Sequence, residues 1–135
     1  MLRAGVRRAT RAGGVLTGHD RSGSWSTVWG MTEAEVITEI GRRLADAVPD
    51  GSRVVLFGSR ARGGAGAASD YDVLVIEPAV ENPAVESARL RGELDELRTP
   101  IDVVVVAEDV ARRRAVVRGT VVDRALREGR VLAHT

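Results

Sequence analysis

Three short apolar runs after residue 50 constrain the fold of this chain more than any other feature of its sequence. They span residues 53–57, 70–77 and 101–107, are rich in valine, leucine and isoleucine, and have the length of buried strands. The intervening segments have helical periodicity, and we expect helices at residues 32–47, 83–97, 108–117 and 121–127. Strands that alternate with helices predict an α/β domain. The glycine-rich link between the first two strands is too short for a crossover helix.

Several of the expected helices carry recognisable end signals. Thr32 and Glu35 form a capping-box pattern at the start of the first helix, and Pro49 follows its end. Gly129 is expected at the C-cap of the last helix. The apolar stripe of the helix at 83–97 consists of Val85, Leu90, Leu94 and Leu97.

The first thirty residues differ in composition from the rest. Residues 1–30 hold five arginines and one aspartate (net charge +4), whereas residues 31–135 hold fifteen arginines and eighteen acidic residues (net charge −3). The first segment lacks periodicity and is rich in Gly, Ser, Thr and Arg, a composition typical of disorder. We therefore expect a disordered tail at 1–30 and a folded domain at 31–135. We favour the choice of start site, or plain disorder, over an arginine-rich anchor for a partner. The main argument against this is the presence of Trp25 and Trp29, since free tails seldom carry two tryptophans.

Composition excludes several classes of chemistry. The chain has no cysteine, which excludes disulfides, thiolate nucleophiles and Cys-ligated zinc. All twenty basic residues are arginine, so Schiff-base chemistry and a phosphate-loop lysine are excluded. A net charge of +1 gives no global argument for binding nucleic acid or membrane. No apolar run approaches the ~18 residues of a membrane span and no secretory signal is evident, so we expect a cytoplasmic protein.

Two aspartates at the start of the second predicted strand are candidate metal ligands. Asp70 and Asp72 are two residues apart, so on a strand their side chains share one face. Two like charges that close favour a cation between them, and magnesium prefers carboxylate oxygens. Asp102 interrupts the next apolar run, and if the two strands are neighbours the three carboxylates converge and can hold two metal ions. The alternative is that Asp70 caps a turn and Asp72 points to solvent.

The segment between these strands has the features of a phosphate-binding loop. Gly58 lets a phosphate approach the backbone, and the Ser59 hydroxyl can donate to a phosphate oxygen. Arg60 and Arg62 can add charge-assisted hydrogen bonds. An ordinary glycine-rich turn is the alternative for the segment alone. The order strand, Gly-Ser, short gap and Asp-x-Asp within a second strand is the more specific pattern.

The stretch LFGSRARGGAGAASDYDVLV resembles the signature of the polymerase-beta-like nucleotidyltransferases, and most closely that of the minimal nucleotidyltransferases of the antitoxin type. The likeness covers about residues 31–132, and the ending at 126–132 resembles the terminal helix and tail of that family. The resemblance implies a small nucleotidyltransferase fold of the α/β class, with a short mixed sheet of at least three strands packed against helices.

The resemblance also assigns roles to the candidate residues. Asp70 and Asp72 match the catalytic metal-binding pair, Asp102 falls at the third carboxylate, and Gly58 and Ser59 match the contacts to the nucleotide phosphates. It implies two Mg²⁺ ions and ATP as substrate. It also implies a helical HEPN-type ribonuclease toxin as partner, neutralised by transfer of AMP to a tyrosine hydroxyl. Arg62 either steadies the charge of the leaving group or pairs with a nearby acid.

Chain length and the residues of the motif separate this function from its competitors. Only about 28 residues follow the third predicted strand, so we expect no second domain for tRNA or DNA and no direct binding of nucleic acid. This argues against a template-directed polymerase, a CCA-adding enzyme and an aminoglycoside-modifying enzyme. Two alternatives remain: an antitoxin that neutralises its toxin by binding alone, and a transferase for a small substrate. The three acids together with Gly-Ser favour the enzyme.

Overall fold

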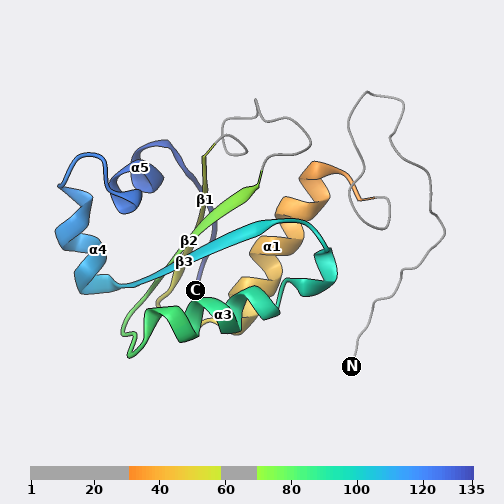
Figure 1. Ribbon diagram of the computed structural model, residues 1–135, viewed down its shortest axis with the longest axis horizontal. Helices are drawn as coiled ribbons and strands as arrows, with labels where there is room; N and C mark the ends of the chain where they lie inside the picture. The colour runs from red at the N-terminus through yellow and green to blue at the C-terminus, as the bar shows by residue number, and fades with distance from the viewer. Residues whose placement is uncertain (1–30, 59–69) are drawn as a thin grey trace. The chain divides into compact units, whose positions relative to one another are not determined.

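The computed structural model describes residues 31–58 and 70–135, and the tail expected at 1–30 lies outside them. The elements in chain order are α1 (Glu33–Ala47), β1 (Arg53–Phe57), β2 (Tyr71–Glu77), α3 (Pro83–Gly92), a short 3-10 helix (Asp95–Leu97), β3 (Ile101–Ala107), α4 (Glu108–Ala115), α5 (Val121–Glu128) and β4 (Arg130–His134) (Figure 1). The chain divides into two compact units, Met1–Glu39 and Ile40–Thr135, and the whole sheet belongs to the second.

In the first unit, the described residues hold the beginning of α1. The amide of Glu35 donates to Oγ1 of Thr32 at 3.1 Å, and the amide of Thr32 donates to Oε1 of Glu35 at 2.8 Å. This reciprocal pair satisfies two backbone donors that the helix itself leaves open. The predicted capping box is therefore confirmed.

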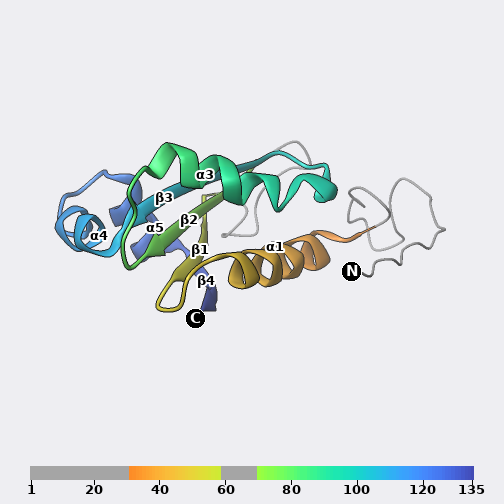
Figure 2. The same cartoon turned by 90° about the horizontal axis from the view of Figure 1, so that it is seen from below.

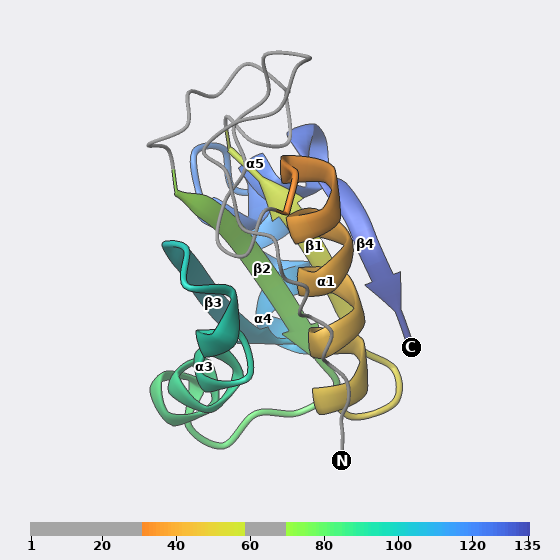
Figure 3. The ribbon, with the colours of Figure 1, turned by 90° about the vertical axis from the view of Figure 1, so that its right-hand side faces the viewer.

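The second unit contains a mixed sheet with strand order β3-β2-β1-β4 (Figure 3). β1 is antiparallel to both β2 and β4, whereas β2 is parallel to β3. The parallel pair is joined by the segment that contains α3, as a crossover requires, and the antiparallel pair by the short glycine-rich link. The predicted α/β class and mixed sheet are confirmed.

Helices cover both faces of this sheet. In Figure 3, α3 and the second half of α1 lie on one face, and α4 and α5 lie on the other. On the α4–α5 face the core consists of Val55, Phe57, Leu74, Ile76, Val106, Ala111, Val122 and Ala125. Side chains alternate along each strand, so Tyr71, Val73 and Val75 face α3, and all three are fully buried. No helix among the described residues is long and apolar enough to cross a membrane.

Two elements differ from the expectation. The helix expected at 83–97 ends at Gly92, and the chain continues through turns into the 3-10 helix, although Leu94 and Leu97 are still buried. The segment expected to be a tail after the last helix contains β4, which pairs with β1 at the edge of the sheet (Figure 2). Val131 in this strand is 59% exposed, so the strand has little of the apolar pattern that marks the other three.

Gly129 lies at the C-cap of α5, as expected. Glycine is required there by the space around the residue and not by its backbone conformation. Its φ is −84°, a value that any residue can adopt. A Cβ placed there would lie 2.6 Å from Cγ1 of Val55 and 2.8 Å from the carbonyl oxygen of Leu56, and would also strike the carbonyl oxygen of Ala125. The missing side chain therefore lets α5 approach β1 closely.

A buried carboxyl pair lies at the end of the sheet where β2 stops. Glu77 is 3% exposed and faces Glu86 on α3. Burial and the adjacent Glu86 raise the pKa of Glu77 to about 7. Two hydrogen bonds from Arg89, at 2.9 and 2.7 Å, and one from Glu77 hold the pKa of Glu86 at about 2. Arg89 also donates to the carbonyl oxygen of Ala47 at 2.8 Å, so the group ties α3 to the end of α1.

Replacing Gly129 with alanine should lower the free energy of unfolding by about 1–3 kcal/mol, because the new Cβ has no space against β1. The matched control is Gly92→Ala at the end of α3, where a Cβ meets nothing within 4 Å. That variant should be unchanged or up to about 1 kcal/mol more stable. Urea denaturation of both variants checks this, and equal stability would contradict the packing argument.

The unfolding free energy should fall by about 1–3 kcal/mol as the pH rises from 4.5 to 7, because unfolded Glu77 loses its proton in this range while folded Glu77 keeps it. Glu86 affects the unfolding free energy over a different pH range. Because its pKa is lowered in the folded protein, its contribution to stability is lost only as the pH falls below about 4.5. Denaturation of wild type and Glu77→Gln at pH 5 and pH 8 tests this. The variant should lose most of the pH dependence, and equal slopes would refute the assignment.

Candidate active site

The two predicted strands that carry the aspartates are neighbours, and they bring Asp72 level with Asp102. β2 and β3 are parallel, and their register pairs Asp72 directly with Asp102. Asp72 shares its face of the sheet with Leu74 and Ile76, which pack in the core against α4 and α5. Asp70 immediately precedes β2, two residues before Asp72. The three acids predicted to converge therefore lie where β2 and β3 begin.

The electrostatics of this end of the sheet are dominated by negative charge. Burial raises the pKa of Asp72, and the charges of Asp102 and then Asp70 raise it further. Arg124 on α5 acts in the opposite direction and lowers it. Asp70 and Asp102 are exposed at the surface, whereas Asp72 is partly buried. A cation that binds at this end of the sheet from the solvent would therefore stabilise the ionised form of Asp72.

The described residues do not form a ready-made metal cage. No group of three or more His, Cys, Asp or Glu side chains in 31–58 and 70–135 is arranged to hold a metal ion. The donor chemistry nevertheless suits magnesium, because that ion is usually held by one or two carboxylates, with substrate phosphates and water completing its shell. Neighbouring carboxylates with a raised pKa on Asp72 fit this type of site.

Gly58 ends β1 and packs directly against Asp72. Phe57 pairs with Asp72 across the β1–β2 ladder, and Gly58 follows with a φ of 80°. A Cβ at position 58 would lie 2.6 Å from Oδ2 of Asp72. Only glycine meets both the backbone and the space requirement. The three other residues expected to bind phosphate, Ser59, Arg60 and Arg62, lie outside the described residues.

Arg124 is a residue of this site that sequence reasoning did not find. Its guanidinium carbon lies 5.7 Å from the centre of the Phe57 ring, at the strand end that leads into Gly58. No local motif marks Arg124, because it comes from the last helix and reaches the site only when α5 folds back over β1. The only sequence signal available was its place on the polar side of an amphipathic helix.

Comparisons with known proteins agree with this geometry. The family model described as the nucleotidyltransferase domain matches residues 37–131. A chain in a crystal structure of a toxin–antitoxin complex with AMP-PNP is 22% identical, with a TM-score of 0.55 and 73% of each chain covered. A chain in the complex of a tri-AMPylated Shewanella oneidensis HEPN toxin with an MNT antitoxin is 18% identical, with a TM-score of 0.51 and coverage of 77% of this chain and 74% of that one.

Similarity to these two structures supports the fold, and no curated protein matches the chain. The family match spans most of the chain, from the first half of α1 to the beginning of β4, and includes β1, Gly58, Asp72 and Asp102. It therefore contains β1, β2 and β3 together with the three acids described above. The chain belongs to the nucleotidyltransferase domain family.

Proposed function

We propose that this protein is a magnesium-dependent nucleotidyltransferase that moves AMP from ATP to a tyrosine hydroxyl of a helical partner toxin, and so acts as an antitoxin. The observation that carries the proposal is the pairing of Asp72 with Asp102 on adjacent parallel strands, with Gly58 packed against the Asp72 carboxylate. Nothing in the core requires carboxylates at these positions. Burial, and then the charges of Asp102 and Asp70, raise the pKa of Asp72, a pattern typical of functional sites.

The identity of donor and acceptor is supported by the structural neighbours. One neighbour is a toxin–antitoxin complex with AMP-PNP, and another is a tri-AMPylated HEPN toxin bound to an MNT antitoxin. Nucleotide binding and AMPylation of a toxin are properties of those complexes. We propose the same properties for this chain because it shares their fold. ATP as donor and a HEPN-type ribonuclease toxin as acceptor fit both.

In the proposed mechanism, Asp70, Asp72 and Asp102 are the residues that would hold two magnesium ions. When bound, magnesium neutralises charge on the phosphates. The backbone at Gly58 and the adjacent Ser59 hold the outer phosphates, and Arg62 follows in the same glycine-rich segment of the sequence. Asp102, exposed at the start of β3, accepts the proton of the acceptor hydroxyl. The hydroxyl oxygen bonds to the α-phosphorus, the bond from that phosphorus to the bridging oxygen breaks, and pyrophosphate leaves.

A second candidate is an antitoxin that neutralises its toxin by binding alone. It is supported by the two similar structures, because each is a complex of a toxin with its antitoxin. The two functions differ in whether neutralisation needs the carboxylates. A variant that lacks them distinguishes the two directly.

The double variant Asp70→Asn and Asp72→Asn should reduce AMP transfer by about 10³-fold or more, because two ligands of the proposed metal are removed. The acceptor in this assay is the protein encoded next to this one, which the proposal expects to be helical. The assay contains labelled ATP and magnesium, and EDTA should have the same effect. Asp50→Asn, an exposed acid in the turn before β1, is the matched control and should be fully active. Labelling that survives in the double variant would exclude the metal-pair mechanism, and toxin neutralisation without labelling would favour binding alone.

Gly58→Ala should reduce AMP transfer by about 10²-fold, because the new Cβ would displace the Asp72 carboxylate from its position. Gly51→Ala is the control, since Gly51 also has a positive φ of 89° and a close neighbour, Cγ of Pro78 at 3.1 Å, but lies at the other end of β1. Both variants should lose about 1–2 kcal/mol of stability from backbone strain. Steady-state transfer rates normalised to folded protein separate the two, and equal activity would contradict the role of Gly58.

A further inference from the structure

We propose that Arg124 is a phosphate-binding residue, whose guanidinium contacts the outer phosphates of the nucleoside triphosphate at the Gly58–Asp72 end of the sheet. The inference rests on the proposed function, because it concerns the same nucleotide site. It adds a residue from α5, an element outside the Gly-Ser and Asp-x-Asp motif. Four features of the described residues support it.

The first is position. The Arg124 guanidinium lies over the ring of Phe57, which is the residue directly before Gly58 and the register partner of Asp72. The proposed function assigns the outer phosphates to the backbone at Gly58. A cation that lies on Phe57 is therefore next to those phosphates and on the same face of the sheet as the Asp72 carboxylate.

The second feature is the availability of its hydrogen-bond donors. Within the described ranges, the Arg124 side chain forms no ion pair or hydrogen bond, and its contact is the face of the Phe57 ring. Arg127, one turn further along the same helix, instead donates two hydrogen bonds to Asp123. Guanidinium donors that remain open can bind phosphate oxygens in a bidentate manner.

The third feature is charge. Three carboxylates at this end of the sheet repel the phosphates of a triphosphate. Arg124 is close enough to Asp72 to oppose the effect of Asp70 and Asp102 on it. A fixed positive charge at that point reduces the repulsion on the protein side of the ligand.

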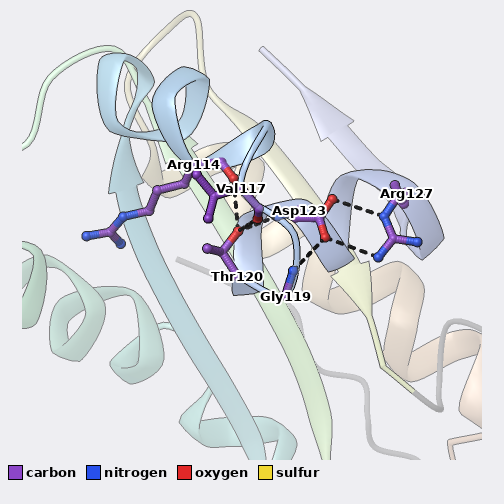
Figure 4. Close-up of polar contacts among 6 residues, drawn as sticks. All are labelled: Arg114, Val117, Gly119, Thr120, Asp123 and Arg127. Carbon is purple, nitrogen blue, oxygen red and sulfur yellow. Dashed lines mark hydrogen bonds and ion pairs between the residues drawn. The ribbon is translucent and has the colours of Figure 1, made fainter.

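The fourth feature is the rigid attachment of the helix that carries Arg124 (Figure 4). Thr120 caps α5: its Oγ1 accepts from the amide of Asp123 at 3.0 Å and donates to the carbonyl oxygens of Arg114 and Val117 at 2.9 and 3.0 Å. Asp123, only 3% exposed, also accepts from the amide of Gly119 at 3.0 Å.

The same carboxylate is held from the other side by Arg127, at 3.0 and 3.1 Å. Arg127 and the Gly119 amide hold the pKa of Asp123 at about 2, so this corner keeps its charges at any physiological pH. Val122 and Ala125 on the opposite side of α5 pack in the core. The backbone of Arg124 is therefore fixed before the ligand arrives, which lowers the entropy lost on binding.

The test compares ATP with AMP, since AMP lacks the outer phosphates. In isothermal titration calorimetry with magnesium, Arg124→Gln should raise the Kd for ATP by about 10- to 100-fold, because a charged hydrogen-bond donor is lost. The Kd for AMP should change by less than about 3-fold. Arg124→Lys keeps the charge without the planar fork and should raise the Kd for ATP by about 3- to 10-fold. The matched control is Arg113→Gln on α4, whose partner is Asp109, and it should bind both nucleotides as wild type does.

Unchanged ATP affinity in Arg124→Gln, or an equal loss for ATP and AMP, would overturn the inference. If that variant fails to fold, Arg124→Lys decides, and wild-type affinity for ATP in it would likewise overturn the inference. A wild-type protein that binds ATP through Arg124 but transfers no AMP would refute the proposed function and leave this inference standing. A wild-type protein that binds neither ATP nor tripolyphosphate would refute both.

Discussion

The parallel pairing of β2 with β3 is the constraint on which the candidate site depends. It places Asp72 level with Asp102, so that two carboxylates face the same side of the sheet across one strand spacing of about 4.8 Å. Parallel pairing requires a crossover, which contains α3, whereas the antiparallel β1–β2 pair needs only a short link. The mixed topology therefore brings Gly58 and two acids to the same end of the sheet.

Much of this arrangement could be predicted because the two central strands, β1 and β2, are buried on both faces and the edge strand β3 is largely buried. The run at 101–107 contains four consecutive valines and lies between two predicted helices. This pattern predicts a buried strand. Asp72 and Asp102 stand out because each interrupts such a run with a charge. The expectation that they converge needed one further condition, that their strands are neighbours, and the structure meets it.

The features that were missed depend on tertiary contacts and not on local pattern. Leu94 and Leu97 continue the apolar stripe of α3, yet the helix ends at Gly92 and both leucines reach the core from turns. β4 lies at the edge of the sheet and exposes Val131, so alternation along it is weak. Nothing in the sequence distinguishes Arg124 from the other nineteen arginines, because its position at the site results from the packing of α5 on β1.

The two ends of β2 each hold a pair of carboxyl groups, and their difference separates structure from function. At one end, Glu77 and Glu86 share a proton, and Arg89 neutralises the charge that remains. The charge of that pair is compensated within the protein, although Oε2 of Glu77 has no hydrogen-bond partner among the described residues. At the other end, Asp72 and Asp102 have Arg124 nearby, but within the described residues its guanidinium pairs with neither acid. Like charges that a fold brings together favour a cation between them, so this uncompensated pair supports the proposal that a hard cation carrying phosphate binds at this end of the sheet.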